Sequence, residues 1–448
     1  MTQHSPASSG PAAPSGRAVG VPAPNGPGRR TSPASGTRRA APAVRRAEVD
    51  AERWPDVARD PSAGAVRTVV ARALVGRALN RLGLAAPGAG ATGRLLTVHD
   101  PDAFHRRIAR DGLIGFGESY MAGEWDSDDL AGALTVLADH ADALVPAPLR
   151  RLRRLWVSAR PAADRNTRAG ARANIRRHYD LSNDLFSAFL DPTLSYSSAL
   201  FTAFPARAAD LAEAQHRKID RLLDLAGVGD GTRLLEIGTG WGELALRAAA
   251  RGARVTTLTL SAEQAGLARA RIAAAGLSDR VDVQLRDYRD AEGRFDAVVS
   301  VEMIEAVGAE YWPSYFAALR RALAPGGRIA LQSITMGHQQ MLRTAATHTF
   351  ISKYVFPGGL IPSRRALSEH SAGAGLTTTA DHGYGAHYAE TLRLWRERFT
   401  AARPTLAALG FDTVFQRMWT FYLAYSEAGF RSGYLDVRHL LLIEGTPR

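Results

Sequence analysis

The 448-residue chain is predicted to be an α/β protein built around a parallel sheet. Two observations predict this fold class. From residue 174 onward, short apolar runs alternate with segments of helical periodicity, and glycine-rich turns separate them. Strands that alternate with helices pair in parallel and are covered on both faces. Such a sheet binds ligands at the carboxyl ends of its strands, where the strand order reverses.

The elements of this sheet follow one another along the chain. A helix with one apolar face is predicted over 209–225, before the first strand. The five strands are predicted at 233–238, 254–260, 281–287, 295–303 and 328–335. The helices between them are predicted at 242–251, 262–275 and 312–323. Residues 436–444 are expected to add a late strand at the sheet edge.

Composition divides the chain into four segments. Residues 1–50 form an Arg-, Pro- and Ala-rich tail that is predicted to be disordered, with a transit peptide as the alternative interpretation. Residues 51–148 are expected to form a small folded domain with an amphipathic stretch over 66–82. Residues 149–173 are a basic linker, and 174–448 are the α/β domain.

Positive charge is concentrated in the tail and around the linker. The formal net charge is +12, and residues 149–177 contain ten Arg against one Asp. A solvated linker explains this charge, but so does a surface for anionic phosphates. Each Arg near an anionic bilayer contributes about 1 kcal/mol of binding. Nucleic acid would satisfy the same charges, so charge alone does not choose the partner.

Composition also excludes several classes of protein. The chain has no Cys, which excludes disulfides, thiolate metal sites and a Cys nucleophile, and no metal site is predicted. It contains no run of about 18 uncharged apolar residues, the length that a membrane-spanning helix needs. The first residues lack the unbroken apolar stretch of a secretory signal. We therefore expect the protein to stay on the side of the membrane where it is made.

A glycine-rich turn follows the first predicted strand. Gly238, Gly240 and Gly242 alternate in Gly-Thr-Gly-Trp-Gly, a pattern that lets the backbone turn tightly and approach a ligand. Glu236 stands two positions before the first glycine. The spacing resembles motif I of class I S-adenosylmethionine (SAM) methyltransferases, with a plain strand–helix turn as the alternative. Glu236 would complement the ammonium group of SAM.

Polar side chains after the second and third strands complete the predicted cofactor site. Thr259, Ser261 and Gln264 stand where most nucleotide-binding folds place an acidic residue for the ribose. Asp287 follows the third strand and can accept a hydrogen bond from an adenine amino group. Its neighbour Tyr288 is a further candidate, with simple packing as the alternative.

Several segments resemble the cyclopropane-fatty-acyl-phospholipid synthase family, which includes the mycolic acid cyclopropane synthases. They are 178–186 (HYDLSNDLF), 190–199 (LDPTLSYSSA) and 353–359 (KYVFPGG). Residues 115–125 resemble the N-terminal domain of the full-length, phospholipid-acting members. The resemblance implies a class I SAM-methyltransferase Rossmann-like sheet with a small N-terminal accessory domain and a helical lipid-binding insertion.

The same resemblance implies a reaction. The family adds a methylene group from SAM across a cis double bond of a membrane phospholipid acyl chain, and Tyr196 and Ser197 should touch the methionine part of SAM. The alkene is a weak nucleophile and the resulting carbocation reacts with water, so the pocket must be dry. A base then removes a proton. Ring closure gives a cyclopropane, whereas a prior hydride shift gives a 10-methylene group.

The resemblance also implies a bound bicarbonate as that base, held by a Cys backbone and by Glu, His and Tyr side chains. Glu305 and Tyr388 fill two of these positions, but the Cys position is Ser198 and the His position is Gln332. Glutamine cannot titrate. These departures resemble an actinobacterial subgroup that makes 10-methylene precursors of tuberculostearic acid. We therefore expect the methylene product, with the cyclopropane as the alternative.

Partners follow from this interpretation. The expected partners are phospholipids with unsaturated acyl chains and an anionic bilayer, at the cytoplasmic, inner face of the cell membrane. The chain shows no second nucleotide motif and no flavin signature, so saturation of a methylene product would need a separate reductase.

Two rival functions remain open. A nucleic-acid methyltransferase would explain SAM and the Arg excess, but the fourth strand lacks the Asn/Asp-Pro-Pro-Tyr/Phe type of motif that holds a flipped base. We therefore expect no nucleic-acid partner. The other rival is a lipid-binding pseudoenzyme, against which the intact glycines and Tyr196-Ser197 speak.

Overall fold

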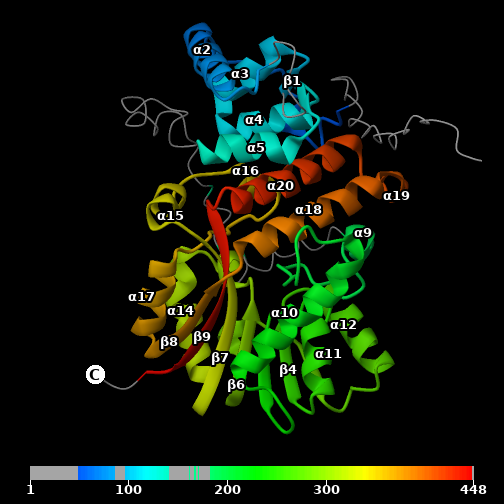
Figure 1. Cartoon of the computed structure of the whole chain (residues 1–448), viewed down its shortest axis with the longest axis vertical. Helices are drawn as coiled ribbons and strands as arrows, with labels where there is room; N and C mark the ends of the chain where they lie inside the picture. Colours follow the sequence, from blue (N-terminus) through cyan, green and yellow to red (C-terminus); the bar gives the residue numbers. More distant parts are fainter. Residues whose placement is uncertain are drawn as a thin grey trace, which may run out of the picture. The chain divides into compact units, whose positions relative to one another are not determined.

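The computed structural model of the chain describes residues 49–85, 96–140, 161, 166, 167, 170 and 182–445. The predicted tail, but for its last two residues, and most of the predicted basic linker lie outside this range. The described residues form an α/β fold around a seven-stranded sheet with the order β5-β4-β3-β6-β7-β9-β8 (Figure 1). The predicted fold class is confirmed.

The first five strands of this sheet are parallel and agree with the predicted ranges to within a few residues. They are β3 (Arg233–Ile237), β4 (Arg254–Thr259), β5 (Val281–Leu285), β6 (Phe295–Val301) and β7 (Leu323–Met336). The order runs outward from β3 in both directions, so the strand order reverses between β3 and β6. The carboxyl ends of these two strands therefore mark the expected ligand-binding point.

The predicted late strand is present, but its predicted position in the sheet is wrong. Residues 436–444 do not lie at the sheet edge, because β9 (Leu435–Glu444) pairs antiparallel with β7 on one side and with β8 (Leu376–Gly383) on the other. The edge strand is β8, whose sequence LTTTADHG is polar and largely exposed. A polar strand suits a sheet edge but shows no apolar alternation, so the sequence pattern did not reveal it.

Helices cover both faces of the sheet because successive side chains of a strand point to opposite sides. Leu234 packs into the core formed with α10 (Leu211–Ala226), α11 (Glu243–Ala250) and α12 (Ala262–Ala274). Its neighbour Leu235 packs into the opposite core, formed with α14 (Trp312–Ala322) and α17 (Arg364–Gly373). These helices match the predicted ranges apart from α17, for which no helix was predicted.

The chain between β7 and β9 supplies a helical insertion, as predicted, although its predicted lipid-binding role stays a prediction. The remaining helices of this region and the loop helices that precede it are α9 (Asn183–Phe189), η4 (Ala208–Asp210), η5 (Tyr288–Asp290), α13 (Ile304–Val307), η6 (Ala309–Tyr311), α15 (His338–Thr344), α16 (Phe350–Tyr354), α18 (Gly385–Ala401), α19 (Arg403–Ala408) and α20 (Thr413–Arg431). In Figure 1, α18 and α20 lie side by side above the upper end of the sheet. Their aromatic side chains join one core with those of α9.

The N-terminal region folds into short elements. These are α1 (Pro55–Ala58), α2 (Ala65–Arg81), β1 (Leu96–Val98), α3 (Pro101–Asp111), α4 (Leu113–Met121), β2 (Trp125–Ser127) and α5 (Leu130–Asp139), with β1 and β2 paired antiparallel. Helices α4 and α5 pack on α20, so this region shares a hydrophobic core with the helical insertion. The predicted domain limits at 50 and 148 stay predictions.

Two contacts hold the N-terminal region against the rest of the protein. The buried Arg417 of α20 donates from Nε to the carbonyl oxygen of Tyr120 at 2.6 Å and pairs through Nη2 with Asp126 at 2.8 Å. At Gly117, a Cβ atom would lie 2.3 Å from the ring of Phe350, so no side chain fits there. Among the described residues, no helix is both long and apolar enough to cross a membrane.

Candidate active site

The cofactor edge of the candidate site begins where β3 ends. Gly238, Gly240 and Gly242 all have positive φ angles, of 99°, 52° and 92°, which side-chain-bearing residues rarely adopt. At Gly242 a Cβ atom would also lie 3.1 Å from the Cβ of Ala268, so this glycine lets α11 and α12 pack closely. The glycine loop therefore has the tight turn that the sequence predicted.

The buried carboxyl of Glu236 provides the test of whether a cationic ligand fits this edge. Its Oε2 is buried and has no hydrogen-bond partner among the described residues. Burial raises the pKa of Glu236 to about 8, although a hydrogen bond with Thr257 and the charge of Lys218 oppose the shift. An orphaned carboxylate oxygen is costly unless a donor or cation meets it. The residues present therefore fit the ammonium group of SAM.

The polar side chains after β4 bond mainly to one another. Thr259 Oγ1 donates to Gln264 Oε1 at 2.9 Å, and Ser261 Oγ accepts from the backbone N–H of Gln264 at 3.2 Å. Ser261 is thus the N-cap of α12. These contacts explain Ser261 structurally, while all three residues stay predicted cofactor contacts.

The structure shows specific partners for both predicted residues after β5. Arg289 donates to the two carboxylate oxygens of Asp287, from Nε at 2.8 Å and from Nη2 at 2.6 Å. Tyr288 packs edge-on against Tyr315, with 5.4 Å between ring centroids. Tyr288 therefore belongs to the core beneath the site, the alternative that the sequence left open.

Tyr196 and Ser197 lie on the loop after α9, and each has a defined partner. The Tyr196 and Tyr422 hydroxyl groups share a hydrogen bond of 2.7 Å, which links the loop to α20. Ser197 Oγ accepts from Lys218 Nζ at 2.8 Å. Both residues are therefore held in place before any ligand binds.

Lys218 is a candidate that sequence reasoning missed. It projects from α10, is 2% exposed, and burial lowers its pKa to about 8 against the opposing charges of Glu302, Asp191 and Glu236. The signal in the sequence was a Lys on the apolar face of a predicted amphipathic helix. A buried ammonium between the two edges of the site balances part of their negative charge.

The candidate reaction centre forms around a residue that was not among the predicted site residues. The carboxylate of Glu302, directly after β6, accepts three hydrogen bonds. Its Oε1 accepts from the backbone N–H of Ser198 at 3.0 Å and from Gln332 Nε2 at 2.7 Å, and its Oε2 accepts from the Tyr388 hydroxyl at 2.6 Å. Three of the four predicted catalytic residues thus converge on Glu302.

The backbone of Glu302 is also unusual. Its φ angle of 49° lies in the left-handed region, which costs a non-glycine residue about 1–2 kcal/mol. Burial raises the pKa of its carboxyl, while the three donors lower it. Glu302 is thus a strained residue at the end of a strand, and three donors bond to its side chain. This combination indicates a functional role.

Glu305, the fourth predicted catalytic residue, does not share this ligand set. Its Oε1 accepts from Ser333 Oγ at 2.9 Å and from the backbone N–H of Ile334 at 2.5 Å. Its Oε2 is buried with no partner among the described residues. Burial, and then repulsion by Glu302, raise the pKa of Glu305 to about 8. The pair therefore favours a proton on Glu305 and the negative charge on Glu302.

A buried histidine fixes the amide of Gln332. His439 on β9 is hydrogen-bonded through Nε2 to Gln332 Oε1 at 2.8 Å. Burial and neighbouring cations lower the pKa of His439 to about 3, so the ring is neutral at physiological pH. A neutral ring that donates from Nε2 leaves the amide nitrogen of Gln332 directed at Glu302.

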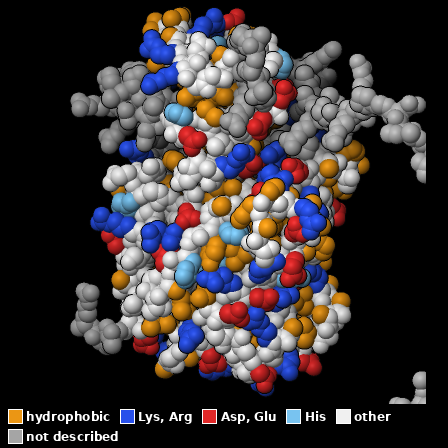
Figure 2. Space-filling model, viewed as in Figure 1, with side chains coloured by type: hydrophobic (Ala, Val, Ile, Leu, Met, Phe, Trp, Pro, Cys, Tyr) orange, Lys and Arg blue, Asp and Glu red, His pale blue; other side chains and the backbone are white. Residues whose placement is uncertain are grey.

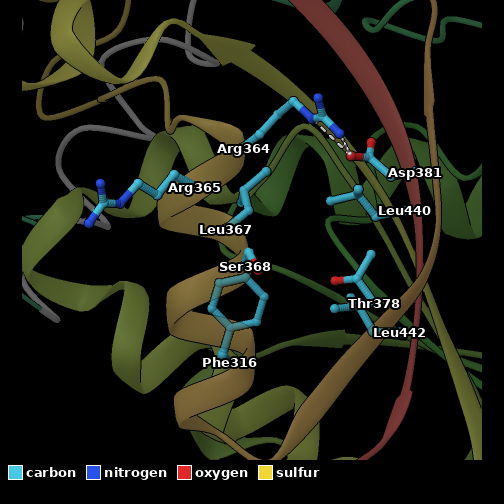
Figure 3. A pocket seen from close by; sticks show the side chains of 9 residues that line it. All are labelled: Phe316, Arg364, Arg365, Leu367, Ser368, Thr378, Asp381, Leu440 and Leu442. Atoms are coloured by element: carbon cyan, nitrogen blue, oxygen red, sulfur yellow. Dashed lines mark hydrogen bonds and ion pairs between the residues drawn. The ribbon is translucent and has the colours of Figure 1, made fainter.

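A separate pocket lies between α17 and the edge of the sheet (Figure 3). Arg364 lines it and pairs with Asp381 at 2.6 Å. Its other lining residues are Phe316, Arg365, Leu367, Ser368, Thr378, Leu440 and Leu442. None of the predicted site residues lines this pocket, so it is not the candidate active site.

The fold and the glycine loop define the α/β class of SAM-dependent methyltransferases. The chain matches the sequence profile of the mycolic acid cyclopropane synthetase family over residues 166–440, and it belongs to that family. It is 54% identical to a tuberculostearic acid methyltransferase, UfaA1 of Mycobacterium tuberculosis, over 90% of this chain and 98% of that protein.

Two further relatives are more distant. The cyclopropane-fatty-acyl-phospholipid synthase of Escherichia coli K12 is 34% identical over 82% of this chain and 92% of its own. The crystal structure of mycolic acid cyclopropane synthase CmaA1 complexed with SAH and CTAB matches with a TM-score of 0.56. It is 32% identical and covers 63% of this chain and 98% of that one.

Proposed function

We propose that the protein is a SAM-dependent methyltransferase that acts on the cis double bond of unsaturated acyl chains in membrane phospholipids. Its product carries a 10-methylene group, the precursor of tuberculostearic acid. The observation that carries this proposal is the 54% identity, over nearly the full length of both chains, to a tuberculostearic acid methyltransferase. The cyclopropane-forming relatives are less similar, at 34% identity or below.

The cofactor edge would hold SAM through its own residues. Glu236 would meet the ammonium group, the glycine loop would allow close backbone approach, and Tyr196 with Ser197 would contact the methionine part. When bound, SAM supplies the methyl group that the alkene attacks. The pre-arranged hydroxyl groups of Tyr196 and Ser197 support this role, because both are already fixed by hydrogen bonds.

The aromatic core beside the reaction centre would keep water away from the carbocation. Tyr196 lies 5.3 Å from Trp395, and Tyr388 lies 4.4 Å from Phe430, between ring centroids. Electron-rich ring faces also attract a positive charge, by about 0.5–2 kcal/mol. This environment favours proton loss over capture of the cation by water.

The expected bicarbonate does not fit the site as it stands. Ser198, Gln332 and Tyr388, which were predicted to hold it, all donate to the Glu302 carboxylate instead. We therefore include no bicarbonate in the proposed function. Gln332, with neutral His439 behind it, supports the methylene product because neither group supplies the titratable histidine that the cyclopropane-forming enzymes are expected to have.

The proposed setting is the inner face of the cell membrane, with an anionic bilayer as the docking surface and a separate reductase as the next enzyme. Most of the basic linker that predicted this surface lies outside the described residues. Helix α2 adds support, because Val66 and Val69 are 78% and 67% exposed beside exposed Arg67 and Arg77. Figure 2 shows basic and hydrophobic side chains interleaved at the end of the view where α2 lies. Such a surface suits a bilayer interface.

The product test is lipid analysis of a host that expresses the chain and is fed oleate deuterated at C10. We expect a 10-methylene chain in which the deuterium has moved to C9. Ozone cleaves the exocyclic methylene to a ketone and leaves a cyclopropane intact, so the two products of equal mass are separated. A host with an empty vector is the control.

Two results would contradict the proposed function. A cyclopropane that keeps deuterium at C10 would show that the methyl-bearing cation closes directly. No methylated lipid at all, with SAM binding retained in calorimetry, would favour the lipid-binding pseudoenzyme.

A further inference from the structure

We propose that the Glu302 carboxylate is the catalytic base of this enzyme, a built-in replacement for a free anion such as bicarbonate. The inference rests on the proposed function, since it concerns the proton that this reaction must release. It assigns the final step to a residue that neither the motif pattern nor the family resemblance singled out.

Among the residues that the structure describes, the hydrogen bonds to Glu302 leave one acceptor position of its carboxylate free. An ionised carboxylate offers about four acceptor positions, two on each oxygen. Ser198 and Gln332 use both positions on Oε1, and Tyr388 uses one on Oε2. The remaining position on Oε2 can accept a proton without breaking any of the three contacts, which also hold the carboxylate in one orientation.

The carboxylate lies in an enclosed site. The three donors are buried, with Ser198, Gln332 and Tyr388 exposed by 2%, 1% and 6%. Glu302 is half-buried as a residue, whereas its three donors are fully buried. A base needs this arrangement, because its supports must exclude water while its oxygen meets the substrate.

Burial keeps this base strong enough to act, because it raises the pKa of Glu302. Glu305 places a second buried carboxyl group near Glu302, and the repulsion between them disfavours two negative charges. Lys218 acts in the opposite direction and keeps the site from losing its charge altogether. A further anion such as bicarbonate would meet this negative charge and would find its three predicted donors already engaged.

The step balances without any other reagent. The alkene electron pair forms the new bond from C10 to the methyl carbon as the sulfur–methyl bond breaks, which leaves the positive charge at C9. A hydride moves from C10 to C9 and transfers that charge to C10. A C–H bond of the new methyl group then breaks. Its electron pair becomes the second bond of the methylene, and the proton passes to Glu302.

The experiment uses the purified full chain, SAM and dioleoyl phosphatidylglycerol vesicles, in buffer freed of carbon dioxide and in buffer with added bicarbonate. We expect the wild-type protein to form the methylated lipid at the same rate in both. Glu302→Gln keeps the side-chain volume but accepts no proton, and should lower the rate by about 100-fold or more. Added anions should not rescue it, because the amide fills the site.

Glu302→Gly provides the decisive comparison. Glycine adopts the left-handed backbone of residue 302 without strain, so this variant should fold. We expect a loss of about 100-fold or more, partly reversed by bicarbonate or formate, which can enter the vacated space between the three donors. SAM affinity, measured by calorimetry, should stay close to that of the wild type. If Glu302 had only a structural role, its loss would weaken SAM binding as well.

The outcomes separate the two proposals. A wild-type rate that falls without carbon dioxide and returns with bicarbonate would overturn the role of Glu302 and leave the proposed function standing. Full activity of the Glu302→Gln variant would also overturn the role of Glu302 and leave the proposed function standing. A wild-type protein that methylates no unsaturated lipid under either condition would overturn the proposed function and the base assignment together.

Discussion

The cofactor edge and the reaction centre lie at the ends of adjacent strands, yet they are assembled in different ways. In the cofactor-edge loops after β4 and β5 the partners are close in sequence, with Thr259 and Gln264 five residues apart and Asp287 and Arg289 two apart. At the reaction centre, Glu302 is held by donors 104, 30 and 86 residues away. A local motif can therefore be predicted from the spacing of its residues. The reaction centre forms only when the sheet and the helical insertion pack together.

The largest expected effect tests whether the reaction centre acts separately from cofactor binding. Tyr388→Phe removes one of the donors that orient the Glu302 carboxylate, and we expect kcat to fall by about 100-fold because a misplaced catalytic group costs a reaction that much. SAM affinity should not change, because Tyr388 lies on the insertion and its hydroxyl group bonds to Glu302 rather than to a cofactor-edge residue. Single-turnover rates and calorimetry measure the two quantities, and an equal loss of SAM affinity would show that the two edges form one unit.

The second prediction concerns the cofactor edge alone. Glu236→Gln removes the carboxylate that would meet the ammonium group, and a hydrogen bond to a charged group contributes about 1.5–3 kcal/mol. We expect the Kd for SAM to rise by about 10-fold or more, with a smaller change in the single-turnover rate at saturating SAM. An unchanged Kd would assign the ammonium group to another partner.

The pH dependence of SAM binding tests whether Glu236 binds the ammonium group as a carboxylate. The pKa of Glu236 is raised to about 8 in the free protein, so the carboxyl is protonated below that pH. A cationic ligand favours the ionised form, so binding should release a proton below about pH 8 and affinity should rise as pH approaches that value. Calorimetry in buffers of different ionisation enthalpy counts the released proton, which the Gln variant should lose.

The smallest expected effect is one of stability within the glycine loop. Gly242→Ala forces a residue with a Cβ into φ 92° and against Ala268, and should destabilise the fold by about 1–3 kcal/mol. Gly266→Ala is the matched control, since Gly266 lies inside α12 with open space around it. That change should stabilise the protein by about 0.5–1 kcal/mol. Urea unfolding measures the change in unfolding free energy of both variants. Changes of the same sign would contradict the proposed role of Gly242.

The same contrast explains how much the sequence could predict. The five parallel strands followed from their apolar runs, and the glycine loop from its spacing. The polar edge strand β8 was missed, because exposed Thr and Asp side chains carry no burial pattern. Because β8 was missed, β9 was wrongly predicted to lie at the sheet edge, whereas it lies between β7 and β8.

Within the site, the identity of the functional residues was easier to predict than the hydrogen bonds between them. Ser198, Gln332 and Tyr388 were selected from the resemblance, and the structure brings all three together. Glu302 was passed over because Glu305, three positions later, fills the glutamate position that the resemblance implies. Only the left-handed backbone at Glu302 and its distant donors distinguish them, and neither property is encoded within a short window.

The link between Arg417 and Tyr120 has a consequence for how the protein is made. The two residues lie 297 positions apart. At about 5–20 residues per second, a ribosome needs roughly 15–60 s to synthesise the chain between them. During that time α4 and α5 have emerged without the helix that covers them. The nascent chain therefore displays an uncovered hydrophobic face until α20 has been synthesised, and such a face is a surface that chaperones bind.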